Sequence, residues 1–302
     1  YLCFFFFFFI FHFVQITLVQ RSTRIHRDWC LMSFADTIKK YYILYKSFFR
    51  ASFVADLEFR FNFFILICAE FIWYSTQLIL YEVLYRHTSR LAGWNLDQMR
   101  VFIFLALFVD SIYMILWDPN FVKFADDLRK GNLDLLLTKP VNEIFMLTSQ
   151  KISISHVPCF FITGGGLVWA LSQLPDFNWF KMLWLIIMIP SGLSVIFCGR
   201  FALNATTILF QRADFLQYVW FSLFRFGLRP DGIYGAVMNG FFRYIMIFIL
   251  PFAMVASIPA RFLLEPLNPL YLIWGILMPM ILLTLTQKYW NYCVRNYSSA
   301  SS

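Results

Sequence analysis

Charged residues are scarce in this sequence. Asp, Glu, Lys and Arg make up 14% of its 302 residues, whereas hydrophobic residues make up 60% and the mean hydropathy is +0.66. Soluble domains carry about 25% charged residues, because their surfaces face water. The period-two alternation of a membrane β-barrel is also missing. The composition therefore excludes a soluble globular domain of useful size and predicts an all-α polytopic membrane protein.

The sequence also lacks the motifs of catalytic and metal-binding sites. Its six cysteines include no CxxC pair, and its four histidines lack the spacing of zinc ligands. No phosphate-binding loop occurs, because the glycines at 164–166 lie in an apolar stretch without a following Lys-Ser/Thr. His156 is interpreted most simply as a hydrogen-bonded helix residue. We therefore expect no catalytic residue, no metal site and no cofactor, and we expect ATP hydrolysis to require a separate subunit.

The net charge of +8 does not indicate nucleic acid as a partner, because no basic tract is interleaved with polar sequence. Lys and Arg lie between the hydrophobic runs, where they meet anionic lipid head groups. The sequence predicts about six spanning helices of about 20 residues each. Their apolar parts are residues 61–85, 101–117, 144–171, 182–199, 244–258 and 267–287. Before them, residues 38–60 repeat apolar side chains at helical spacing and predict an amphipathic helix in the inner membrane interface.

The distribution of Lys and Arg predicts the orientation of the spans. If the segment before residue 61 is cytoplasmic, 18 Lys and Arg residues lie inside and five lie outside. The inside set includes Arg225, Arg229 and Arg243, between the fourth and fifth spans. The sequence therefore predicts a multi-pass protein of the plasma (inner) membrane with both termini in the cytoplasm.

Residues 1–31 form a doubtful N-terminal segment. Six consecutive Phe residues at 4–9 are followed by Arg21, Arg24 and Arg27, whereas a signal peptide carries its positive charges before the apolar region. One interpretation is an additional signal-anchor helix. The other, which we favour, is a non-native extension before a start at Met32. The six-helix transmembrane domain then covers residues 32–302.

Two acidic residues lie well inside the predicted spans. Glu70 belongs to the first span and Asp110 to the second. An ionised acid at such a position costs roughly 2.5–3.5 kcal/mol or more, so these residues usually face the bundle interior or a water-filled path. We therefore treat Glu70 and Asp110 as candidates for a translocation path, with hydrogen bonding between packed helices as the alternative.

The loop after the second span contains two helix-stop signals. Gly131 tolerates the left-handed backbone that ends a helix, and Pro140 ends the helical turn that follows. Between them, Leu133, Leu136 and Leu137 share one side of that turn. An apolar stripe on so short a helix must be buried, either against the bundle or against a partner.

These segments resemble a known family. The sequences GNLDLLLTKPV at 131–141, LEFRFNF at 57–63 and LPFAMVASIP at 250–259 are similar to those of the ABC type-2 permeases, the membrane subunits of ABC exporters. The resemblance extends over about residues 34–295. It implies a six-helix half-transporter that pairs with a second permease copy or paralogue and binds two copies of a separate cytoplasmic P-loop ATPase. The implied ATPase-coupling residues are Asp127, Arg129, Gly131, Leu133, Asp134, Leu136 and Pro140.

Residues 211–243 either add to the same coupling surface or place their apolar stretch, 215–226, in the membrane. Two other functions also stay open. A proton-coupled secondary transporter would use Glu70 and Asp110 but predicts internal repeats, and we find none that is convincing. A membrane-embedded transferase would need clustered His, Asp, Glu, Ser or Cys residues at the interface, which the sequence does not indicate.

Overall fold

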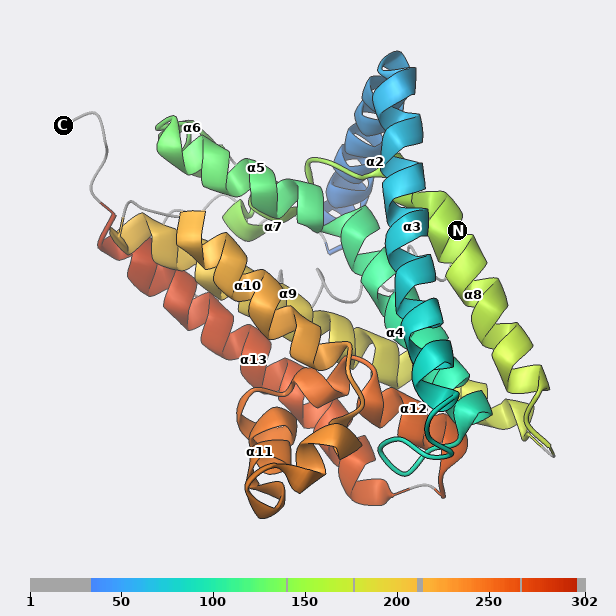
Figure 1. The fold of residues 1–302 in the computed structure, drawn as a ribbon. Coiled ribbons are helices and arrows are strands. Elements are labelled where there is room, and N and C mark those ends of the chain that lie inside the picture. Colours follow the sequence, from blue (N-terminus) through green and yellow to red (C-terminus); the bar gives the residue numbers. More distant parts are fainter. Residues whose placement is uncertain (1–33, 140, 176, 211–213, 267, 298–302) are drawn as a thin grey trace.

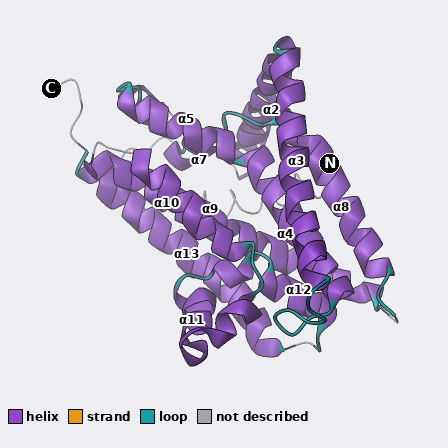
Figure 2. Cartoon of the chain, in the orientation of Figure 1, coloured by secondary structure: helices purple, strands orange, loops and turns teal. Residues whose placement is uncertain are grey.

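The computed structural model describes residues 34–139, 141–175, 177–210, 214–266 and 268–297. These residues form helices joined by turns, and no strand occurs among them (Figures 1 and 2). The all-α prediction is therefore confirmed. The predicted segment 1–31, the start at Met32 and the helix stop at Pro140 lie outside the described residues.

Five described segments are long and apolar enough to cross a membrane. They are α3 (Arg60–Tyr85), α4 (Leu96–Leu116), η2 with α8 (Ile154–His156 and Val157–Ser172), η3 with α9 (Trp179–Trp184 and Leu185–Phe210), and α13 (Pro269–Arg295). These segments match the first four predicted spans and the sixth. The third span begins later than predicted, because a separate short helix, α7 (Glu143–Ser149), ends before it.

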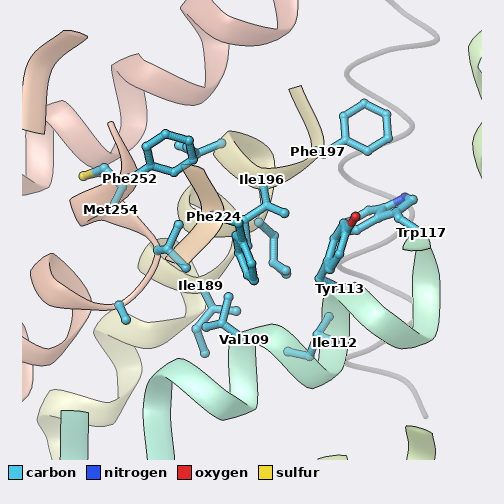
Figure 3. Packing of buried hydrophobic residues seen from close by; sticks show 14 of the residues in the cluster. Val109, Ile112, Tyr113, Trp117, Ile189, Ile196, Phe197, Phe224, Phe252 and Met254 are labelled. Atoms are coloured by element: carbon cyan, nitrogen blue, oxygen red, sulfur yellow. The ribbon is translucent and has the colours of Figure 1, made fainter. Parts of the chain in front are cut away.

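The long helices pack in two groups (Figure 1). Helix α4 lies against α8 and α3, whereas α9 lies against α13 and α10 (Asp214–Gly227). The two groups meet where α4 contacts α9, and aromatic rings fill this junction (Figure 3). The ring centroids of Trp117 and Phe197 are 5.4 Å apart, and those of Tyr113 and Phe224 are 5.9 Å apart. Such close packing holds spanning helices together, because lipid leaves no hydrophobic driving force between them.

Residues 244–258 do not form the predicted fifth span. The chain there changes direction through α11 (Phe241–Tyr244), the π-helix η5 (Ile245–Ile249), η6 (Phe252–Met254) and α12 (Ser257–Leu264). Pro251 interrupts the helix because it has no backbone N–H to donate. Arg243 near the start of this segment and Arg261 near its end both bind Asp231. Residues 241–264 therefore form a re-entrant hairpin that begins and ends at the same end of the molecule.

Helix α10 takes the course expected of the fifth span. It runs back along α9. Trp220 lies against Gly199, just past the middle of α9, and Gly227, seven residues later, lies against Val255, which contacts Gly192 in the first third of α9. The apolar stretch 215–226 thus belongs to the bundle and not to a loop. With 14 residues, α10 rises about 21 Å, which is short for a full crossing.

The chain after α10 lies at the end of the molecule that carries the 86–95 loop, which we call the α12 end. A Cβ atom on Gly232 would lie 2.6 Å from the carbonyl oxygen of Ala92. The predicted inside position of Arg225, Arg229 and Arg243 is therefore wrong relative to that loop. Transferring these three residues changes the count from 18 against five to 15 against eight, so the charge asymmetry is weaker but keeps its sign.

Helix α2 (Phe34–Glu58) corresponds to the predicted amphipathic helix. It binds the stretch 142–154 through three hydrogen bonds. The Tyr41 hydroxyl accepts from the Asn142 backbone N–H at 3.2 Å, Ser52 from that of Ile152 at 3.0 Å, and Asp56 from that of Ile154 at 2.9 Å. These bonds join α2 to both ends of the stretch that contains α7 and leads into η2.

Candidate functional site: the coupling loop and the polar groups of the bundle

The coupling surface predicted at residues 126–141 lies within a segment of three short helices, residues 118–149, which we call the coupling loop. These are α5 (Asp118–Arg129), α6 (Leu133–Leu137) and α7 (Glu143–Ser149), at the end of the molecule that we call the α6 end (Figure 1). Between α5 and α6 the chain turns at Gly131, whose φ of 70° favours glycine. Asp127 closes this turn, because its carbonyl oxygen accepts from the Asn132 N–H at 2.9 Å and its carboxylate from the Asn132 amide at 3.3 Å.

The structure buries Leu133 and Leu136, two leucines of the predicted stripe, within the chain itself. Leu133 is fully buried and Leu136 is 8% exposed, whereas Leu135 between them is 67% exposed. Of the two alternatives left open by the sequence, burial against the bundle is therefore the one observed. The exposed loop face consists of Lys130, Leu135, Thr138 and Lys139.

The loop is firmly attached to the bundle. The Trp290 indole of α13 donates to the Glu143 carboxylate of α7 at 2.8 Å. Asn120 of α5 is bonded to both backbone groups of Lys151, at 2.6 and 2.8 Å. Asp134 lies beside Tyr297, just after α13, and burial together with this carboxylate raises the pKa of the Tyr297 hydroxyl. The loop is therefore bonded to α13 and to the stretch that leads into η2.

The structure brings together the two acids that the sequence singled out. Glu70 of α3 contacts His156 at the end of η2, with 3.1 Å between Oε1 and Nε2. One turn further along α3, the Tyr74 hydroxyl donates to Oδ2 of Asp110 at 3.1 Å. Asp110 is 2% exposed, and the side chains of Glu70 and His156 are 14% and 12% exposed. We call Glu70, Tyr74, Asp110 and His156 the bundle cluster.

A second acid lies next to this cluster. Asp118 at the start of α5 accepts from the Tyr113 hydroxyl at 3.1 Å, and the buried Arg200 of α9 lies within electrostatic range of it. The Arg200 guanidinium also lies 5.8 Å from the ring centroid of Trp220 in α10. Asp118 and Arg200 thus form an oppositely charged pair between α5 and α9.

A third group of charges, at the α12 end, was not found from the sequence. Asp231, with a side chain only 1% exposed, binds Arg261 at 2.9 Å and Arg243 at 2.7 Å. Arg261 also binds Glu265 at 2.7 Å and lies 5.4 Å from the ring centroid of Trp94. These bonds fasten the re-entrant hairpin to the 86–95 loop.

Sequence reasoning missed the pairing of His156 with Glu70 because 86 positions separate them. The sequence did contain one indication of a polar site on α3. Glu70 and Tyr74 lie four residues apart and therefore on one face of that helix. Arg129 ends α5, and Pro140 lies outside the described residues. Among the described residues, no group of three or more His, Cys, Asp or Glu side chains is arranged to hold a metal ion.

Comparison with known proteins agrees with this architecture. A family model described as "ABC-2 family transporter protein" matches residues 71–301, which is more than half of the chain. No curated protein and no solved structure matches the chain in such comparisons. The matched range extends from within α3 to beyond α13 and includes the coupling loop, the re-entrant hairpin and the bundle cluster except Glu70, which lies one residue before it. The chain belongs to the ABC-2 family of transporter proteins.

Proposed function

We propose that this chain is the permease subunit of an ATP-driven exporter, and that it forms the translocation path and couples to a separate cytoplasmic P-loop ATPase. Membership of the ABC-2 family makes it a membrane component of an ABC transporter. The observation that carries the proposal is the exposed loop face, which projects from a loop bonded to α13 and to Lys151, ahead of η2. A partner that moves this face would also move the bundle.

The composition of the exposed loop face fits a protein partner. Leu135 exposes its apolar side chain between Lys130 and Lys139, both also exposed. Burying one Leu side chain stabilises an interface by about 1.5–3 kcal/mol. Two flanking cations would select a partner with an acidic rim. The buried Leu133 and Leu136 would hold the face in place without contacting the partner.

Leu135→Ser should weaken co-purification of the ATPase by roughly tenfold or more, because about 1.4 kcal/mol corresponds to a factor of ten. Protein level should stay normal, since this side chain contacts little of its own chain. Leu270→Ser, which replaces a leucine 71% exposed at the α12 end, is the matched control and should retain the partner.

Glu70→Gln adds a contrast in the same assay. Glu70 and Asp110 are our candidates for the translocation path, so this variant should alter transport while the ATPase stays bound. Full retention of the ATPase by Leu135→Ser would exclude the exposed loop face as the coupling surface.

We place the chain in the plasma (inner) membrane, with both termini and the α6 end in the cytoplasm, paired with a second permease copy or paralogue. The charge asymmetry supports this orientation. In a cysteine-free background, a membrane-impermeant maleimide should label Ser89→Cys and Gly235→Cys in intact cells. Lys130→Cys should react only after permeabilisation. Labelling of Lys130→Cys in intact cells would show that the orientation is the reverse of the one proposed. If only one of the cysteines at positions 89 and 235 is labelled in intact cells, the two positions lie on opposite sides, which would contradict the course of α10.

A further inference from the structure

The bundle cluster has more negative groups than positive ones. Three carboxyl groups lie within electrostatic range of one another, namely Glu70, Asp110 and Asp118. Arg200 balances one of them, which leaves two carboxyl groups and a single imidazole, His156. Burying an uncompensated charge is costly, and two nearby carboxylates disfavour each other's ionisation. Uptake of protons is the direct way to reduce this excess.

The atoms around Glu70 show the same deficit. Its Oε1 contacts His156, but its Oε2 is buried and has no hydrogen-bond partner. Asp110 has a neutral partner, the Tyr74 hydroxyl, and no basic side chain is bonded to it among the described residues. His156 is therefore the group through which positive charge can enter the site.

The surroundings of His156 suit both of its protonation states. Nδ1 lies 2.7 Å from the Ser153 hydroxyl, which in turn lies 2.9 Å from the Ser155 hydroxyl. A hydroxyl can donate or accept. When the imidazole is neutral, Ser153 donates to Nδ1 while Nε2–H donates to Glu70. When it is protonated, Nδ1–H donates to Ser153, which turns its own hydrogen toward Ser155. His156 thus gains or loses a proton without losing a hydrogen bond.

We propose that His156, together with Glu70 and Asp110, forms a binding site for one exchangeable proton inside the helical bundle. The proton binds at Nδ1 of His156 and converts the contact with Glu70 into an ion pair. This assignment does not rest on the proposed coupling to an ATPase.

Proton binding at this site affects how firmly α3 is attached to the bundle. Only Tyr74 and Tyr81 of this helix are buried, so its attachment to the bundle depends on few contacts. Lipid tails compete with its apolar contacts, whereas they offer nothing to its polar groups. The bonds of Glu70 and Tyr74 therefore hold α3 against η2 and α4, and a protonated His156 strengthens the first of them. Loss of the proton should loosen α3.

Other titratable or charged groups face this site from each neighbouring element. They are Asp56 of α2, Tyr113 of α4, Asp118 of α5, Cys159 of α8 and Arg200 of α9. Asp56 bonds to the Ile154 backbone, and Asp118 is offset by Arg200, so neither supplies the missing positive charge. The proton-dependent change is accordingly assigned to His156.

Nitrogen-15 NMR of the full chain with labelled histidine tests the site directly. His156→Gln identifies the His156 resonances by their loss. Between about pH 5 and 8, the interval in which histidine usually titrates, they should change from the imidazolium to the neutral pattern. In Glu70→Gln the proton should leave at a lower pH, because the anionic partner is gone. An unchanging His156 spectrum over this interval, or the same titration in Glu70→Gln, would overturn the proposal.

Thermal unfolding of the purified chain gives a second readout. Protonated His156 stabilises the docked α3, so the unfolding temperature should fall as the pH rises from about 5 to 8. This slope should be lost in His156→Gln and kept in His87→Gln, the control for an exposed histidine at the α12 end. An undiminished slope in His156→Gln would contradict the assignment. At pH 8 the imidazole of His156 is neutral under this proposal, so His156→Gln and His87→Gln should unfold at about the same temperature if His156→Gln folds normally.

Discussion

Replacing both Leu133 and Leu136 with serine should prevent the protein from accumulating in the membrane. Removing a buried leucine side chain typically costs about 2–5 kcal/mol, and a serine hydroxyl without a partner adds to that cost. Two such changes approach the whole stability of a typical domain, about 5–15 kcal/mol. Immunoblotting of membranes and thermal unfolding in detergent measure the effect.

Leu135→Ser is the internal control for this experiment, because it places the same substitution on the exposed side of α6. It should accumulate normally. If the double variant instead reaches wild-type levels and loses only the ATPase, Leu133 and Leu136 contact the partner, and their burial in the chain is not what holds the loop.

Arg261→Met should destabilise the α12 end by about 3–5 kcal/mol, the usual cost of removing one partner from a buried ion pair. It would leave Asp231, whose side chain is 1% exposed, with Arg243 as its remaining basic partner, and it would remove the ion pair between Arg261 and Glu265. Arg261→Lys should recover only part of the loss, because an ammonium group cannot bind Asp231 and Glu265 as the planar guanidinium does.

The ion-pair explanation can be checked with a double variant measured by thermal unfolding. Adding Asp231→Asn to Arg261→Met removes the buried carboxylate that is left with Arg243 as its one basic partner, and it should recover part of the stability. A double variant that is less stable than Arg261→Met alone would show that Arg261 acts through packing against Trp94 and not through its charge.

Hydropathy predicted those spans that are single continuous helices. It failed for residues 244–258, because an apolar window does not show that Pro251 interrupts the helix or that Arg243 and Arg261 meet at Asp231. It also left α10 undecided, since 14 residues are too few for a clear signal. In both cases the missing information was a contact between distant parts of the chain.

In the candidate sites, too, local features could be predicted from the sequence, whereas contacts between distant residues could not. Gly131 could be identified from the sequence because its role is local: it supplies the left-handed backbone that ends α5. The sequence showed that Leu133 and Leu136 need to be buried, but it did not show which surface would bury them. The contact of His156 with Glu70, and the neighbouring bond of Tyr74 to Asp110, depend on how three helices pack, and no residue spacing specifies that.

The re-entrant hairpin imposes an order on how this protein is made. Its π-helix, its break at Pro251 and its tightly packed residues 252–258 leave irregular backbone that a lipid environment cannot satisfy. Close contact of Met254 and Val255 with Gly192 requires α9 to be in place first. Gly275 of α13 packs from the other side, against Met188 and Met254. The hairpin can therefore take up its packed position only after both α9 and α13 are present, and α13 follows the hairpin in the sequence.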